Sequence, residues 1–147
     1  MKISGAHPIP AAPERAYAAL QDPAILAKSM PGCERLEQTG EDEYRMVLKM
    51  AIASIAGQFD GRIWITDKNP PEGFTLNVEG KGKPGFVKGS GALRVLGNGT
   101  GAEVRYDGDV QVGGTIAAVG QRLIDTTARL MIKRFFDKLA EQLAAGG

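Results

Sequence analysis

The C-terminal stretch, residues 115–143, is the feature that most constrains how this sequence can fold. Its apolar side chains recur at steps of three and four, as one row of Ile116, Val119, Leu123, Thr127 and Leu130 and a neighbouring row of Ile124, Ala128, Met131, Phe135, Leu139 and Leu143. This period predicts a single amphipathic helix. A helix of about 28 residues is ~42 Å long. Because so long an apolar face must be covered, we expect a wide layer of other elements to lie against it.

The segments that precede this helix alternate between apolar and polar residues, which is typical of strands with one buried face. Strands are predicted over residues 2–9, 34–38, 43–53, 57–67, 74–82, 89–96 and 104–112, and two short helices are predicted to start at Pro13 and Pro23. Short connections between consecutive strands require antiparallel pairing. The sequence therefore predicts an α+β fold in which a curved antiparallel sheet of about seven strands wraps around the C-terminal helix. At this length the chain is expected to form one domain, residues 1–147.

Composition excludes several classes of function. The 18 Lys and Arg residues nearly balance the 17 Asp and Glu residues, so the net charge of +1 creates no global field that would attract nucleic acid. The single Cys33 cannot form an intramolecular disulfide, which fits a reducing compartment, and the cytoplasm is expected. The sequence has no apolar run of signal-peptide or membrane-spanning length. We therefore expect neither secretion by that route nor a membrane span.

Glycines are concentrated in the predicted strands, where they are normally unfavourable. They are Gly57, Gly61, Gly80, Gly82, Gly85, Gly89, Gly91 and Gly108. One interpretation is that they form bulges and bends that curl the sheet. The other interpretation is that their missing side chains leave a cavity beneath the helix. The two interpretations are compatible. The residues expected to line such a cavity and bind a ligand are Met46, Met50, Phe59, Ile63, Phe86, Val110, Val112, Ile116, Val119, Leu123, Thr127 and Met131. A plain packed core is the alternative.

Motifs for catalysis and metal binding are sparse. Residues 97–101 are rich in glycine but lie between two predicted strands, so they indicate a hairpin turn rather than a phosphate loop. One His and one Cys, far apart, do not make a metal site. A nucleophilic Cys33 would need His7 as its base, and the alternative is an inert buried thiol beside a packed imidazole. We predict no catalytic residue, no metal site and no intrinsic cofactor.

Two further features suggest surface contacts. Residues 80–89 combine three lysines and four glycines with Phe86 and Val87, and they predict a mobile hairpin tip. Such a tip is either a solvated connection, a lid on the cavity, or a contact for an acidic partner or anionic lipid headgroups. Trp64 is predicted to face outward, where it suits an interface or packs at an edge.

Three stretches together resemble the family of the carbon monoxide dehydrogenase G subunit, within the START-like (SRPBCC) helix-grip domains. The first is Leu20-Gln21-Asp22-Pro23 followed by Met30-Pro31-Gly32-Cys33-Glu34-Arg35-Leu36-Glu37. The second is Val112-Gly113-Gly114-Thr115-Ile116-Ala117 continuing into Gly120-Gln121-Arg122-Leu123-Ile124, and the third is Phe135-Phe136-Asp137-Lys138-Leu139. The resemblance extends over nearly the whole chain. It implies a helix-grip fold that encloses an apolar cavity.

The resemblance also implies a function. Members are non-catalytic accessory proteins of molybdenum hydroxylases of the carbon monoxide dehydrogenase type, so the subunits of such an enzyme are expected partners. The cavity is expected to take a hydrophobic small molecule, such as an isoprenoid quinone or another lipid, and the protein to recruit the enzyme to the cytoplasmic face of the inner membrane by peripheral contact. Many relatives continue past the long helix into a membrane-seeking tail, whereas this sequence ends at residues 144–147. The alternatives are a START-like cyclase or hydrolase that acts on a hydrophobic substrate, and a ligand-free interaction or maturation module.

Overall fold

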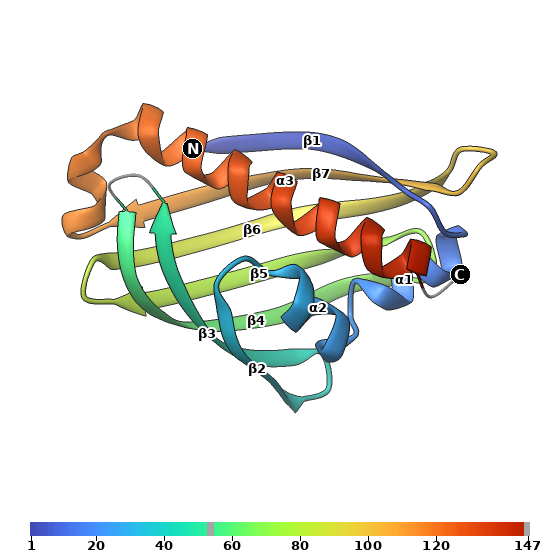
Figure 1. Cartoon of the computed structure of the whole chain (residues 1–147), viewed down its shortest axis with the longest axis horizontal. Helices are drawn as coiled ribbons and strands as arrows, with labels where there is room; N and C mark the ends of the chain where they lie inside the picture. Colours follow the sequence, from blue (N-terminus) through green and yellow to red (C-terminus); the bar gives the residue numbers. More distant parts are fainter. Residues whose placement is uncertain (53–54, 146–147) are drawn as a thin grey trace.

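A computed structural model describes residues 1–52 and 55–145, without the side chain of Ile52. It has the α+β architecture that the alternation predicts, a curved seven-stranded antiparallel sheet with one long helix across its concave face (Figure 1). In chain order the elements are β1 (Lys2–Ile9), α1 (Pro13–Ala19), α2 (Pro23–Ser29), β2 (Cys33–Gly40), β3 (Glu43–Ile52), β4 (Ile55–Asn69), β5 (Gly73–Gly82), β6 (Gly85–Gly97), β7 (Ala102–Gly113), the 3₁₀ helix η1 (Thr115–Val119) and α3 (Gln121–Ala145).

The sheet order is β1-β7-β6-β5-β4-β3-β2, so the chain runs as hairpins from β2 to β7 and β1 pairs with β7. Strands β1 and β2 therefore form the two opposite edges. The connection between β5 and β6 is much shorter than the sequence suggests. Gly82 pairs directly with Gly85, which leaves Lys83 and Pro84 alone in the turn. The expected mobile tip over residues 80–89 is therefore wrong, because most of it is paired strand.

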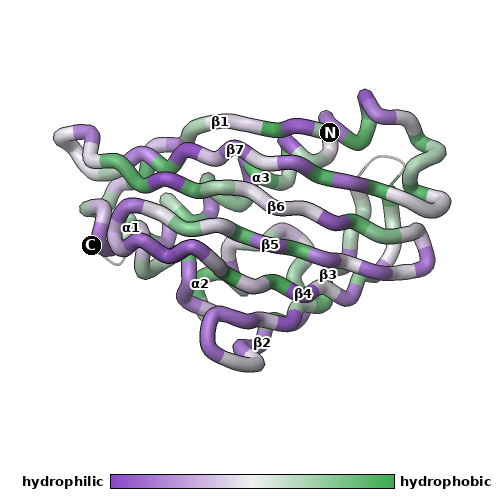
Figure 2. The backbone as a smooth tube through the Cα atoms, turned by 180° about the vertical axis from the view of Figure 1, so that it is seen from behind, coloured by the Kyte–Doolittle hydropathy of each residue, from purple (hydrophilic) through white to green (hydrophobic). Residues whose placement is uncertain are grey.

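Alternation along the strands assigns side chains to the two faces of the sheet as predicted. Figure 2, which views the sheet from behind, shows apolar and polar residues interspersed along the strands. On β4, Phe59, Ile63 and Ile65 are buried on the concave face. Trp64 points the other way and is half-buried, because the Arg62 guanidinium carbon lies 4.4 Å from the centre of its ring. This cation–π contact explains the position of the Trp side chain without a partner molecule.

The expected single helix over residues 115–143 is wrong at its start. Residues Thr115–Val119 form the separate 3₁₀ helix η1, and α3 begins only at Gln121. The two are separated by Gly120, whose φ of +97° lies outside the range of a right-handed helix and favours glycine. Gly114, with φ of +82°, lets the chain leave β7 in the same way. Within the described residues, no helix is both long and apolar enough to cross a membrane.

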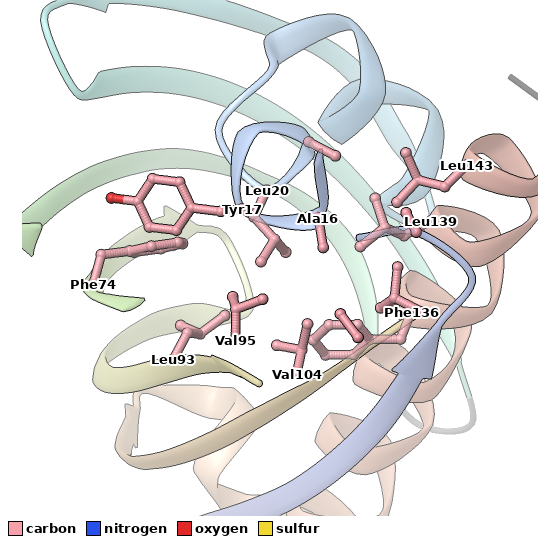
Figure 3. Close-up of a cluster of buried hydrophobic side chains, with 14 of the residues drawn as sticks. Ala16, Tyr17, Leu20, Phe74, Leu93, Val95, Val104, Phe136, Leu139 and Leu143 are labelled. Atoms are coloured by element: carbon pink, nitrogen blue, oxygen red, sulfur yellow. The ribbon is translucent and has the colours of Figure 1, made fainter. Parts of the chain in front are cut away.

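The main core lies at the C-terminal end of α3. There α3 packs against α1 and the strands through the side chains of Ala16, Tyr17, Leu20, Phe74, Leu93, Val95, Val104, Phe136, Leu139 and Leu143 (Figure 3). A smaller cluster, formed by Leu48, Ile55, Phe59 and Ile116, gathers η1 against β3 and β4. The concave face is thus closed by packed side chains in two places, and the space between them is the candidate site.

The main core predicts how α3 is anchored. Leu139 is 0% exposed, so Leu139→Ala removes buried methyl groups and leaves a void. We expect the free energy of unfolding, measured by urea denaturation followed by circular dichroism, to fall by about 2–5 kcal/mol. The neighbouring Lys138→Ala, at an exposed position, should change it by less than about 0.5 kcal/mol. Equal effects of the two variants would contradict this account of the anchor.

Candidate functional site

A cavity of about 380 Å³ lies between the concave face of the sheet and α3. Nine of the residues predicted from the sequence line it, namely Met46, Met50, Phe59, Ile63, Val110, Val112, Ile116, Thr127 and Met131. They come from the strands β3, β4 and β7 and from the helices η1 and α3, so residues far apart in the sequence surround the same cavity. That they bind a ligand stays a prediction.

Three predicted residues, Phe86, Val119 and Leu123, are not on the wall. Phe86 is 46% exposed on the outer face, because β6 starts at Gly85 and the alternation turns Val87 inward instead. Val119 packs against the smaller core cluster without reaching the cavity. Leu123 lies in the first turn of α3 and does not reach the cavity, although Thr127, four residues later in the same row, does.

Sequence reasoning also missed part of the wall. The residues concerned are mainly Ile3, Leu76, Val78, Val87, Ile124, Ala128, Ile132 and Phe135. The β5 pair was detectable, since Leu76 and Val78 alternate in phase with the buried Phe74. Of the α3 residues, Ile124, Ala128 and Phe135 belong to the second apolar row of the sequence, next to the row that the prediction placed inside, and Ile132 lies in neither row. Because the apolar stripe of this helix is wider than one row, the sequence does not determine which row faces the sheet. Packing in the folded protein decides it.

Glycines hollow the sheet face of this cavity. Gly61 pairs with Gly80 on β4 and β5, and Gly91 pairs with Gly108 on β6 and β7, and all four line the cavity. A Cβ added at Gly80 would meet no atom within 4 Å, whereas one at Gly108 would lie 2.9 Å from the carbonyl oxygen of Ser90. Gly80 therefore leaves volume unfilled, while Gly108 permits a close approach between strands. Gly80 thus supports the cavity interpretation, whereas Gly108 gives no support to a bulge, because β6 and β7 pair there without a shift of register.

Charged side chains that border the cavity form their hydrogen bonds away from it. Arg62 borders the cavity, but its Nε donates to the Glu43 carboxylate at 2.7 Å. Asp109 also borders it and accepts from the N-terminal amine at 3.0 Å, a bond that lowers the pKa of this carboxyl group. Thr127, at 4% exposure, is the buried polar residue on the helix side of the wall. The wall is thus suited to an apolar molecule with few hydrogen-bonding groups.

The comparisons with known proteins bear on this geometry. The sequence matches the family described as the G subunit of carbon monoxide dehydrogenase (CoxG) over residues 5–144. The chain belongs to this family. A conserved protein of Geobacillus kaustophilus, solved by crystallography, is similar to this CoxG family member at 36% identity with a TM-score of 0.94, over 99% of this chain and 96% of that one. The comparison with curated proteins returns no match.

More distant solved structures show the fold alone. A Thermus thermophilus protein is similar at 17% identity and a TM-score of 0.75, over 100% of this chain and 99% of that one. Norcoclaurine synthase of Thalictrum, in complex with a transition-state analogue, is similar at 13% identity and a TM-score of 0.69, over 99% and 95% of the two chains. The family and the START-like helix-grip fold expected from the sequence are therefore confirmed.

The Cys33–His7 pair considered from the sequence does not form in this CoxG family member. His7 lies on β1 and Cys33 on β2, which are opposite edges of the sheet. Cys33 packs against the smaller core cluster, and burial raises the pKa of its thiol, which disfavours the nucleophilic thiolate. Residues 1–52 and 55–145 contain no group of three or more side chains that could hold a metal ion.

His7 is instead part of the packed end of the molecule. Its ring stacks on Phe136, with the ring centroids 4.5 Å apart, and lies 6.0 Å from the ring of Tyr106. Burial lowers the pKa of His7 below the usual 6.5, and of the two charged neighbours Asp137 opposes this shift while Lys133 adds to it. The lowered pKa favours the neutral imidazole, which stacks on the ring of Phe136 and is not among the residues that line the cavity.

The lowered pKa of His7 predicts a pH dependence of stability. The unfolded chain takes up the proton more readily than the folded one, so the free energy of unfolding should fall as the pH drops from about 6.5 through the folded-state pKa. In His7→Phe, which keeps the aromatic stack, this part of the decline should vanish. The measurement is the urea midpoint of both proteins between about pH 7.5 and about pH 5.5, above most carboxyl titrations. Parallel profiles for the two proteins would contradict the assignment.

Proposed function

We propose that the chain is a non-catalytic accessory subunit of a molybdenum hydroxylase of the carbon monoxide dehydrogenase type. In this proposal it binds a hydrophobic, lipid-like molecule between α3 and the sheet. An isoprenoid quinone is the leading candidate, because it would carry electrons away from the enzyme. The accessory role is supported by membership of the CoxG family. The observation that carries the binding role is the largely apolar cavity of about 380 Å³.

The size and chemistry of the cavity support a ligand rather than loose packing. Its volume falls within the usual range of small-molecule sites, about 300–1,000 Å³. Burying apolar ligand surface there contributes roughly 25 cal/mol per Å². Four methionines, Met30, Met46, Met50 and Met131, lie on the wall, and their flexible thioethers suit a chain-like ligand that adopts several conformations.

An enzyme of START-like fold is the second candidate, and the positions of the polar residues disfavour it. Such an enzyme needs at least two polar groups that converge inside the cavity. The sequence offers His7, Tyr106, Arg94 and Thr127 as polar residues for such a role. His7 is in the aromatic stack and Arg94 is exposed. Tyr106 and Thr127 border the cavity, but within the described residues no hydrogen bond joins their side chains into a converging pair. The likeness to norcoclaurine synthase, at 13% identity, concerns the fold alone.

The open space at Gly80 provides a test of ligand binding. Gly80→Ile should project a β-branched side chain into the cavity without a clash, at a strand position that favours such residues. We expect the variant to remain folded and to retain at least about tenfold less decylubiquinone than the unchanged protein, a cost of about 1.4 kcal/mol in binding free energy. The probe is added in excess, unbound probe is removed by gel filtration, and the retained quinone is extracted and measured by mass spectrometry.

The matched control is Ala92→Ile, which adds the same side chain at an exposed position on the outer face of β6. It should retain as much quinone as the unchanged protein. Urea denaturation of both variants verifies that they are folded. Equal retention by Gly80→Ile and Ala92→Ile, with both folded, would refute ligand binding in the cavity.

A further inference from the structure

Strand β2 is an open edge of the sheet, on the side opposite β1 (Figure 1). Strand β3 pairs with one side of it, and no strand of the described residues pairs with the other. The backbone of residues 34–40 also makes no backbone hydrogen bond to the loops or helices that the structure describes. Such an edge presents free N–H and C=O groups that a further strand can bind.

The other edge, β1, is protected from such pairing. Pro8 has no N–H group to donate, and Nη1 of Arg129 on α3 donates to the Ser4 carbonyl oxygen at 3.5 Å. Strand β2 contains no proline, and no side chain of another described element is hydrogen-bonded to its backbone. Of the two edges, β2 is therefore the one that can accept another strand.

Opposite charges flank an apolar residue in the middle of β2. Arg35 and Glu37 lie on the outer face, with 70% and 52% of their side chains exposed, and Nε of Arg35 donates to the Glu37 carboxylate at 2.7 Å. Leu36 lies on the concave face, where it packs against the main core. Irregular pairing with β3 near both ends of the strand leaves residues 35–38 as its regular part. The regular edge is therefore short and carries one positive and one negative charge.

The order of these side chains is complementary to itself in an antiparallel pair. A two-fold axis at Leu36 places Arg35 of each copy opposite Glu37 of the other, so both cross-strand pairs join opposite charges. An axis at Arg35 or at Glu37 would place two like charges opposite each other, which is destabilising. A shift of the register by one residue would join the concave face of one copy to the outer face of the other. Leu36 is thus the centre that pairs the charges favourably.

We propose that two copies of this chain associate through their β2 strands, as an antiparallel pair centred on Leu36, and so form a symmetric dimer with one continuous sheet. The two-fold axis also brings the β2–β3 turn of each copy toward the end of α2 of the other, where the exposed Glu41 and Lys28 have opposite charges. The proposal is independent of the proposed ligand, because no residue of β2 lines the cavity.

The order of charges favours a second copy as the partner, because the complement that β2 requires is β2 itself. Pairing over so short a strand buries less than the roughly 1,000 Å² of a stable interface, so we expect a weak and reversible dimer. Charged residues on an edge strand can instead keep the edge free of partners. In that case the protein stays monomeric at every concentration, and sedimentation distinguishes the two.

The test is sedimentation velocity of the full chain between about 5 and about 500 µM, a range chosen for a weak interface. We expect the weight-average sedimentation coefficient to rise with concentration from that of a monomer toward that of a dimer. In Arg35→Glu both cross-strand pairs become pairs of carboxylates, so the Kd of the dimer should increase at least about tenfold. Glu37→Arg should have the same effect, because both pairs then join guanidinium groups.

A mixture of these two variants should restore association. In the mixed pair, the carboxylates at positions 35 and 37 of one chain lie opposite the guanidinium groups at positions 37 and 35 of the other. We expect the equimolar mixture to associate with a Kd within about threefold of that of the unchanged protein. Mixing does not rescue a strand that is merely destabilised, so this result does not depend on how either variant folds alone.

The matched controls change the same types of charge on β7. Arg105 and Glu103 are also two residues apart, and Nε of Arg105 donates to the Glu103 carboxylate at 2.9 Å, but β7 is paired on both sides. Arg105→Glu and Glu103→Arg should therefore associate as the unchanged protein does, within about twofold in Kd. Urea denaturation verifies that each variant is folded.

Disulfide cross-linking tests the register. In a Cys33→Ser background, Leu36→Cys places the new thiol next to its own copy at the two-fold axis, with about 5.5 Å or less between the Cα atoms. The control is Thr39→Cys at an exposed position, whose two copies would lie about 20 Å apart along the strands. Under mild oxidation we expect a covalent dimer of Leu36→Cys and none of Thr39→Cys.

Four results would overturn the proposal. The first is a protein that stays monomeric at about 500 µM. The second is equal association by the β2 and β7 variants, or a mixture of Arg35→Glu and Glu37→Arg that fails to associate, since the copies would then meet through another surface. The third is cross-linking at Thr39 rather than at Leu36. The fourth is a monomer whose β2 variants no longer co-purify with the hydroxylase, since β2 would then receive a strand of that enzyme.

Discussion

The packing of the C-terminal half of α3 is the contact on which the rest of the structure depends. Phe136, Leu139 and Leu143 are buried against α1 and the strands, so this half of the helix is fixed to one end of the sheet. The other half runs over the hollow of the curved sheet. The smaller cluster around Ile116 closes the sheet again beyond it. A helix held at both ends over a concave surface leaves space beneath its middle, and the cavity follows from that geometry.

The glycines decide whether such a space is filled. Large side chains at the inward positions of β4 and β5 would occupy it and add buried apolar area, which stabilises a fold by roughly 25 cal/mol per Å². Gly61 and Gly80 forgo this contribution side by side. The dense core around Leu139 offsets the loss elsewhere in the domain. The residues on the concave face of the sheet therefore produce both the densely packed core at one end of the domain and the hollow beneath the middle of α3.

Much of this fold could be predicted from the sequence, because alternation and helical periodicity are set by neighbouring residues and are kept in the folded protein. They predicted the strand faces and nine residues of the cavity wall, including Met46 and Phe59. The position of Phe86 could not be predicted, since it depends on the pairing of Gly82 with Gly85 and hence on where β6 begins.

The break at Gly120 shows why the least predictable feature matters for the site. A helix continued unbroken from Thr115 would turn by about 100° per residue and keep Val119 and Leu123 on one stripe. The positive φ of Gly120 separates η1 from α3, so Val119 and Leu123 lie in different elements, and Ile124 of the second apolar row lines the cavity. The same break leaves η1 as a short separate piece, held to the β5–β6 turn through Ile116. The composition of the cavity wall thus depends in part on an irregularity that helix propensity alone does not predict.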